Sequence, residues 1–253
     1  YYDYRRPEGE YTSFRLDKSN NHQLTQDGVS KNRGNGQHGY GELSYEIDSL
    51  NLINVSFNRH YGKGKGRSDW DVRNLDDANS VLTQYHQYGN SENTYGGTDV
   101  GVDYQRTFAN KKDRLLTISY KYSTNPNDSE SNTTMDPVVA PPATSSTLTR
   151  LITDAEIEEH TGQVDFVTPF NKIHSIEAGA KYIARNNKSE NDRYVNNTLI
   201  PSDYDNFRHK NNILGAYTGY SLKKGKWGTK VGLRLETTLL KAEFLDDRSK
   251  DFD

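Results

Sequence analysis

Residues 98–122, TDVGVDYQRTFANKKDRLLTISYKY, decide the fold class. In the first half, Val100, Val102 and Tyr104 alternate with acidic side chains and glycine, and after the polar turn Ala109–Asp113 the alternation resumes in residues 114–122. A period of two is typical of a β-strand with two unlike faces, whereas an amphipathic helix repeats every 3.6 residues. The stretch therefore predicts one antiparallel hairpin.

The same pattern occurs four times and predicts eight strands, to which residues 9–16 would add a ninth. The predicted hairpins lie near residues 38–61, 98–122, 161–185 and 212–238. The predicted long loops, rich in Asn, Ser, Asp, Gly and Pro, lie near residues 17–37, 62–93, 125–158 and 186–208. Short turns thus alternate with long loops, which is typical of outer-membrane barrels with periplasmic turns and extracellular loops. The expected fold is an all-β, antiparallel up-and-down transmembrane barrel segment of eight or nine strands.

Composition supports a membrane-embedded sheet. Hydrophobic residues make up 32% of the 253 residues, against roughly 45–50% in soluble domains, yet 18 Tyr and 8 Phe argue against disorder. No run approaches the ~18 apolar residues of a transmembrane helix, whereas a transmembrane strand needs only about 9–11 residues with alternate ones facing lipid. The formal charge of -3 gives no support for nucleic-acid binding. The chain begins at Tyr1, so we expect it to be processed or excised.

Aromatic residues predict two belts on the lipid-facing side. One set lies beside the short turns, and the other lies about nine residues farther along the strands, a climb of roughly 23 Å against the ~25 Å lipid-facing band. The first set is Phe108, Phe170 and Trp227, and the second is Tyr61, Tyr122 and Tyr182.

The opposite face is expected to line a wet lumen. Its predicted members are Glu42, Glu46, Asp103, Lys121, Asp165, Glu177, Lys181, Lys230, Arg234 and Glu236. Arg59 and Arg106 fall instead on the apolar face, where an arginine at mid-bilayer would cost about 2–4 kcal/mol. Both stand near strand ends, from which they can reach the interface.

Alternation by itself would also fit a soluble all-β binding or adhesion module, whose apolar face packs against a second sheet. The seven histidines lack metal-ligand spacing, and the acidic run 154–158 reads as a solvated loop rather than a cation site. We find no nucleophile motif or phosphate loop, and therefore expect no enzyme, metal or cofactor. Three loop tyrosines, Tyr85, Tyr88 and Tyr95, could stack on a ligand at the external mouth.

Four stretches resemble the outer-membrane β-barrel family related to TonB-dependent receptors of Bacteroidetes-type bacteria. They are GYGELSYEIDSLNLINVSFNRHYG around residues 38–61, YGGTDVGVDYQRTFANKKDRLLTISYKYSTNPNDSE, QVDFVTPFNKIHSIEAGAKYIARNNKSEND and NNILGAYTGYSLKKGKWGTKVGLRLETT. The resemblance covers most of residues 38–240. It implies a barrel of about 22 strands that encloses a plug domain, is driven by the TonB complex, and imports a siderophore, oligosaccharide or peptide. A surface lipoprotein is a further partner that the resemblance suggests.

The chain departs from that family in lacking a plug-like domain, a TonB box and a terminal strand that ends in an aromatic residue. Neither transport nor ligand residues therefore carry over to this stretch alone. We expect its outer strands to present open edges, with the strand near residues 227–237 as one of them.

Turn length predicts the strand register. A four-residue turn at Lys223–Lys226 would pair Leu222 with Trp227 and Tyr220 with Thr229. A three-residue turn in the first hairpin would pair Ile47 with Asn51, and Tyr45 with Ile53.

Overall fold

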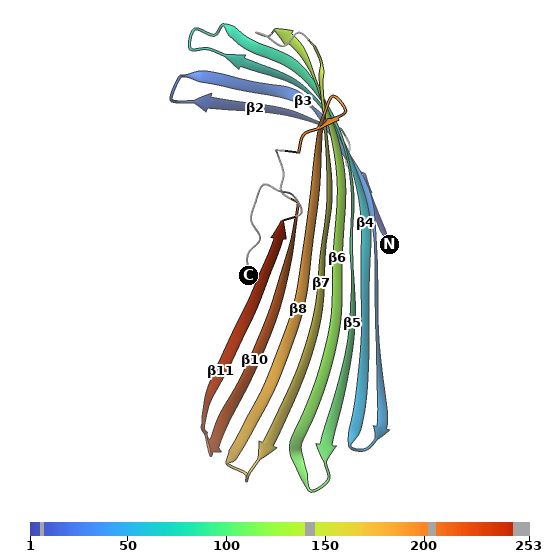
Figure 1. Ribbon diagram of the computed structural model, residues 1–253, viewed down its shortest axis with the longest axis vertical. Coiled ribbons are helices and arrows are strands. Elements are labelled where there is room, and N and C mark those ends of the chain that lie inside the picture. The colour runs from blue at the N-terminus through green and yellow to red at the C-terminus, as the bar shows by residue number, and fades with distance from the viewer. Residues whose placement is uncertain (6–7, 140–144, 202–205, 245–253) are drawn as a thin grey trace.

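The computed structural model describes residues 1–5, 8–139, 145–201 and 206–244, which form one antiparallel sheet (Figure 1). Its strands are β1 (Tyr2–Arg5), β2 (Gly9–Asp17), β3 (His22–Asp48), β4 (Asn51–Leu75), β5 (Val81–Phe108), β6 (Lys111–Val139), β7 (Thr147–Pro169), β8 (His174–Val195), β9 (Thr198–Leu199), β10 (Phe207–Lys224) and β11 (Trp227–Phe244). The eight long strands β3 to β8, β10 and β11 lie side by side in chain order, whereas β1 and β2 both pair with β3, and β9 pairs with β8. The predicted all-β, up-and-down antiparallel fold is confirmed. Within the described ranges, no helix is long and apolar enough to cross a membrane.

The four short turns lie together at one end of the sheet, at the bottom of Figure 1. In the last of them, Gly225 has φ +61, a value that glycine adopts without strain. Such a glycine closes a two-residue turn, so Lys224 pairs with Trp227 and Tyr220 pairs with Val231. The predicted four-residue turn was wrong by two residues. Because side chains alternate with period two, this slip leaves the faces of both strands unchanged.

The first hairpin contains a bulge that the sequence did not predict. Tyr45 pairs with Ile53 as expected, but Asp48 rather than Ile47 lies opposite Asn51, because the register shifts between Glu46 and Asp48. The Asp48 carboxylate accepts hydrogen bonds from the Leu50 backbone N–H and from the Asn51 side-chain amide, each at 2.8 Å. These bonds stabilise the tight turn and leave Ile47 as the extra residue.

The predicted long loops were wrong. Strands β3 to β8 are 22 to 29 residues long, and they continue through most of the segments near 17–37, 62–93, 125–158 and 186–208. There the backbone ladder persists, but Asn, Ser, Thr and Gly stand on both faces and erase the period-two signal. Residues 140–144 and 202–205 of these segments lie outside the described residues, as does the C-terminal stretch 245–253. The proposed ninth strand at residues 9–16 exists as β2, but among the described residues it pairs only with residues 22–30 of β3.

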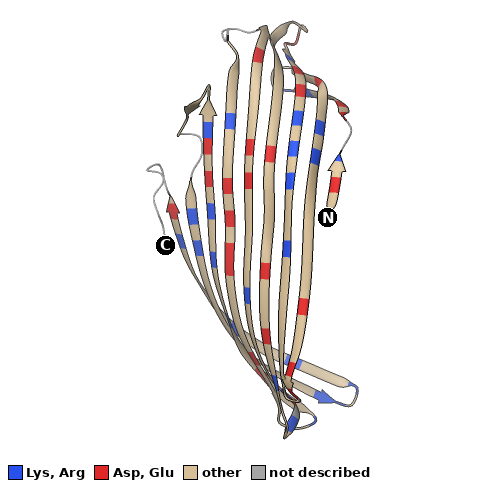
Figure 2. Cartoon of the chain, turned by 90° about the vertical axis from the view of Figure 1, so that its right-hand side faces the viewer, with Lys and Arg blue, Asp and Glu red and all other residues tan. Residues whose placement is uncertain are grey.

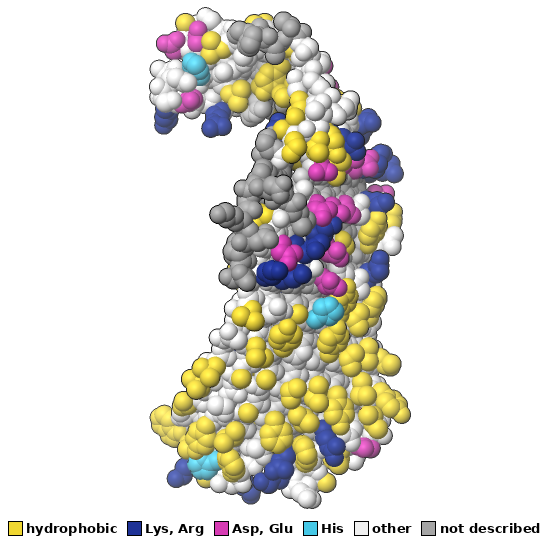
Figure 3. All heavy atoms as spheres, viewed as in Figure 1, with side chains coloured by type: hydrophobic (Ala, Val, Ile, Leu, Met, Phe, Trp, Pro, Cys, Tyr) yellow, Lys and Arg dark blue, Asp and Glu magenta, His cyan; other side chains and the backbone are white. Residues whose placement is uncertain are grey.

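The sheet has no conventional core. Among the described residues, only Val72 and Ala242 are buried hydrophobic side chains, whereas Val231, Leu233 and Leu235 are 65%, 64% and 68% exposed. Hydrophobic side chains cover the lower half of one face, and charged side chains gather above them (Figure 3). No second sheet formed by the described residues packs against this apolar surface.

Two edges of the sheet are open within the described part of the chain. Strand β11 pairs only with β10, and residues 37–48 of β3 pair only with β4. Eight long strands side by side therefore do not bring their two outer edges together.

Candidate functional site

The lower half of the sheet presents two unlike faces, and their positions follow from the strand register. Val55 lies opposite Val102, and Ile118 lies opposite both Tyr104 and Val164, so the apolar side chains form one continuous face. The ten polar residues predicted to line a lumen occupy the positions that alternate with these apolar residues along each strand (the other strand parity), and they share the opposite face. That this face lines a lumen stays a prediction.

The upper tyrosines are staggered in the register. Tyr61 lies opposite Gly96, whereas Tyr122 lies opposite Val100, four residues lower on β5. Tyr122 lies opposite His160 on β7, and His160 lies opposite Ala184 on β8, which is two residues above Tyr182. Strands tilted in a barrel wall require such a stagger for residues at equal height. Their placement is therefore compatible with one belt.

The hydroxyl groups of Tyr122 and Tyr182 reach polar partners above the apolar band. Tyr122 donates to Glu158 at 3.2 Å, and Tyr182 donates to Asn212 at 3.0 Å. An apolar ring with a polar tip suits a membrane interface, although the assignment of the belt to a lipid boundary remains a prediction.

The lower aromatic residues lie at the short turns. Phe108 packs edge-on against Phe166 with ring centroids 6.3 Å apart, and the guanidinium carbons of Arg106 and Arg114 lie 5.6 and 5.4 Å from the Phe108 centroid. Arg106 therefore has an aromatic partner at the end of its strand. Phe170 and Trp227 are 58% and 83% exposed.

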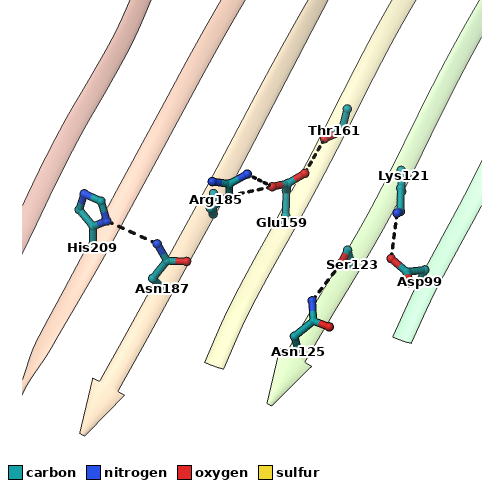
Figure 4. Close-up of polar contacts among 9 residues, drawn as sticks. All are labelled: Asp99, Lys121, Ser123, Asn125, Glu159, Thr161, Arg185, Asn187 and His209. Carbon is teal, nitrogen blue, oxygen red and sulfur yellow. Dashed lines mark hydrogen bonds and ion pairs between the residues drawn. The ribbon is translucent and has the colours of Figure 1, made fainter. Parts of the chain in front are cut away.

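A row of polar contacts crosses the opposite face at the level where the apolar band ends (Figure 4). Asp99, Ser123, Glu159 and Arg185 follow one another across β5, β6, β7 and β8. Lys121 Nζ lies 2.9 Å from Asp99 Oδ1, and Glu159 Oε2 accepts from Arg185 Nε and Nη2 at 2.7 and 2.6 Å. Two charge pairs thereby link adjacent strands.

The predicted polar residues take part unevenly in such contacts. Lys121 binds Asp99, Lys230 binds Glu177 at 2.6 Å, and Arg234 binds Glu236 at 2.6 Å. Gln163 donates to Asp165 at 2.7 Å, and Tyr40 donates to Glu42 at 2.6 Å. In the described ranges, no ion pair involves Glu46, Asp103 or Lys181. Sequence reasoning missed Glu159 and Arg185 as partners because Glu159 lies between the predicted loop 125–158 and the hairpin predicted to begin at residue 161. Extending the alternation by one residue pair would have found them.

Several oxygen atoms on this polar face lack a donor in the described structure. They are Asn58 Oδ1, Asp165 Oδ1, Asn187 Oδ1 and Asn211 Oδ1. Buried acceptors normally have a hydrogen-bond donor, so these atoms can accept hydrogen bonds from water or from a second polar surface. The described residues contain no group of His, Asp and Glu that could hold a metal ion.

The three tyrosines proposed to stack on a ligand do not form a loop cluster, because all three lie on β5. Tyr88 faces the side opposite to Tyr85 and Tyr95 by strand parity. Tyr95 instead makes a hydrogen bond with Tyr2 at 3.0 Å between their hydroxyl groups. The rings of Tyr95, Tyr2 and Tyr4 cover Gly62, Gly36 and Gly34 respectively, in space that a side chain would otherwise fill. Sequence reasoning missed Tyr2 and Tyr4, whose glycine partners are distant in sequence.

The chain matches a known protein family. The model of the outer membrane protein beta-barrel family matches residues 106–253, which is more than half of the chain. The match includes β6 to β11 and therefore the Glu159–Arg185 and Glu177–Lys230 pairs. No curated protein matches the chain.

Proposed function

The chain belongs to the outer membrane protein beta-barrel family, and from this premise we propose that it forms part of the wall of an importer of bulky nutrients. The family places the chain in the bacterial outer membrane, where its exterior contacts lipid. The proposed function is the import of a bulky nutrient across this membrane. It resembles that of TonB-dependent receptors, in which a wide barrel encloses a plug.

The observation that carries this proposal is the failure of eight adjacent long strands to close. Eight strands suffice to complete the smallest barrels, and side chains fill the interior of such a barrel. An eight-stranded sheet with separated edges has the curvature of a wider wall. Barrels of about 22 strands have a lumen that holds a plug.

The polar face suits contact with such a plug. Its ion pairs fix charged side chains in place, and its unpaired acceptors, such as Asn187 Oδ1 and Asn211 Oδ1, can receive donors from a second protein surface. We propose that the remaining barrel strands continue from the two open edges. The plug would connect the barrel to the TonB complex, and a surface lipoprotein could assist capture at the external ends. We assign the chain no catalytic role.

The soluble alternative, a binding or adhesion module, has less support. It needs a second layer against Val231, Leu233 and Leu235, and the described residues form none. Purification separates the two classes of protein. A membrane barrel stays monodisperse only with an amphiphile, whereas a soluble module would remain monodisperse in detergent-free buffer.

Uptake by cells tests the import proposal. Cells with and without the full-length protein would receive radiolabelled ferric siderophores, oligosaccharides and peptides, with and without a protonophore. We expect the cells that lack the protein to lose uptake of one substrate class, and the protonophore to abolish that uptake in cells that keep it. Equal uptake of every class in both strains, or protonophore-insensitive uptake, would contradict energised import. Restoring the gene controls for indirect effects.

A further inference from the structure

Five basic side chains form a cluster on the outer face of the sheet, above the apolar band. They are Lys31 and Arg33 on β3, and Lys63, Lys65 and Arg67 on β4. All five are exposed, and Figure 2 shows blue bands following one another on neighbouring strands in the upper half of the sheet. Four of them, all except Lys63, line one hollow together with Asn90, Ser91 and Glu92.

The cluster has the same strand parity as the apolar band. Register is continuous along β4 from Leu52 to Asn74, so Lys63, Lys65 and Arg67 share the face of Val55, Phe57 and Tyr61. The cluster begins two residues above Tyr61, and Lys63 Nζ lies 5.9 Å from the centroid of the Tyr61 ring. With short turns on the periplasmic side, as in outer-membrane barrels, these cations lie at the outer leaflet.

The electrostatics of the cluster are unfavourable without an added anion. Arg33 lies directly opposite Lys65, and Lys31 lies directly opposite Arg67. Like charges in these positions destabilise a sheet. Within the described residues, the one carboxylate that forms an ion pair with the cluster is Glu92, which binds Lys65.

Other acidic side chains around the cluster are engaged elsewhere. Asp69 and Asp71 contact His86 at 2.9 and 3.4 Å, Glu130 contacts Arg150 at 2.9 Å, and Asp3 on β1 contacts Arg5 at 4.0 Å. The cluster therefore retains positive charge that these carboxylates do not neutralise.

The neighbouring sector of the same outer face has the opposite character. Above Tyr122, strands β6 and β7 present Asp128, Asp154, Glu156 and Glu158. Lys188 beside them contacts Asp154 and Glu190 at 4.0 and 3.0 Å. A generic requirement for cations at the interface would not leave one sector basic and the next acidic.

We propose that the Lys31–Arg67 cluster binds the phosphate-bearing, acidic glycolipid of the outer leaflet. Phosphate and carboxylate groups are the anions that Lys and Arg bind with charge-assisted hydrogen bonds. Arg67 lies six residues beyond Tyr61, which is about 15 Å higher for a strand tilted near 40°. A glycerophospholipid headgroup layer is only about 5–7 Å thick per leaflet and would reach the lowest cation alone. An acidic sugar headgroup reaches all five.

Lipid retention tests the proposal in the full-length protein. The protein would be extracted from outer membranes in mild detergent, and bound glycolipid per protein would be measured by mass spectrometry. Each neutralised cation should lower retention roughly fivefold, so the double variant Lys31→Gln/Arg67→Gln should lose about 25-fold. The matched control Lys188→Gln/Lys210→Gln removes two cations from the same face outside the cluster and should retain glycolipid within about twofold, since these residues make no part of the hollow.

Equal retention by the cluster variant and the wild type, or an equal loss in the control, would overturn the proposal. Nanodiscs made with phosphatidylglycerol instead of the glycolipid provide a second arm, and equally tight binding to them would reject the glycolipid assignment. The heat-dependent gel shift of folded barrels verifies folding. If the double variant does not fold, Arg67→Gln alone should still show the roughly fivefold loss. The inference requires outer-membrane placement but not nutrient import, so the two proposals can fail separately.

Discussion

The lower and upper halves of the same strands differ in their side chains but not in their backbone pairing. In the lower half of β5 and β6, Val102, Tyr104, Ile118 and Tyr120 form an apolar face. In the upper half, the same two strands pair Ser91 with Ser131 and Thr94 with Asp128 in the same register, although Gly96 and Gly97 between the halves have no partner on β6. Backbone hydrogen bonding therefore makes the strand, whereas side-chain alternation reports which solvent each face meets.

The largest expected effect comes from placing a charge in each half of one strand, which tests whether the two halves meet different environments. Ile118→Arg lies on the apolar face between the two aromatic belts and should destabilise the folded protein in lipid vesicles by about 2–4 kcal/mol. Thr134→Arg, on the same face of β6 in the upper half, should change stability by less than about 0.5 kcal/mol. Urea unfolding in vesicles, followed by the gel shift, measures both. Similar costs for the two variants would show that the halves share one environment.

An intermediate effect is expected from the polar row. Glu159→Gln removes the partner of Arg185, and both side chains are only partly exposed, at 25% and 40%. The cost should be about 1–2 kcal/mol, above that of an exposed surface pair but below that of a buried one. Glu236→Gln, which removes the partner of Arg234, serves as the control, because that pair is more exposed, at 53% and 44%, and it should cost at most about 0.5 kcal/mol. A double-mutant cycle with Arg185→Gln should show coupling for the first pair, and its absence would mean that the row is not a stabilising contact.

A smaller effect is expected at the last turn. Gly225→Ala places a side chain at φ +61 and should cost about 1 kcal/mol. Gly225→Asn should cost less, because asparagine tolerates this conformation. If alanine is neutral in the same vesicle unfolding assay, the two-residue turn is wrong, and with it the pairing of Lys224 with Trp227.

The smallest effect concerns acid stability in the upper half. Hydrogen bonds from Asn132, followed by the Arg150 interaction, lower the pKa of Glu130 from its usual 4.5. A lowered folded-state pKa means that the stabilisation is present above about pH 4.5 and is lost as the pH falls through the folded-state value. Since Glu130 is 42% exposed, solvent screening limits the contribution to a few tenths of a kcal/mol. Unfolding midpoints of Glu130→Gln and wild type should therefore differ at pH 6 and converge near pH 3, and a constant difference would contradict this assignment.

The sequence was sufficient for the lower half and insufficient for the upper half. Alternation around Val102 and Ile118 predicted the strands, their faces and the positions of the turns. It could not predict strands such as residues 125–139, because polar side chains on both faces carry no period. The sequence pattern also could not predict the geometry of turns that depend on a single residue, such as the turn at Gly225 and the bulge at Ile47.

The candidate site divides in the same way. Parity alone grouped Lys121, Glu177 and Lys230 on one face. Their partners depend on cross-strand register, which joins residues such as Glu159 and Arg185 across 26 positions of sequence. Tyr2 and Tyr95 are 93 positions apart, and only the complete sheet brings them together.

Quenching by brominated lipids tests the central claim, that the lower apolar face contacts the acyl chains of the lipid while the other face and the upper strands do not. These 253 residues contain no cysteine, so single cysteines at Val102, Asp103 and Thr134 can carry an environment-sensitive fluorophore in the full-length protein. We predict strong quenching at Val102, and weak quenching both at Asp103, on the opposite face, and at Thr134, on the same face higher up. Equal quenching at all three positions, or stronger quenching at Asp103 than at Val102, would contradict the account.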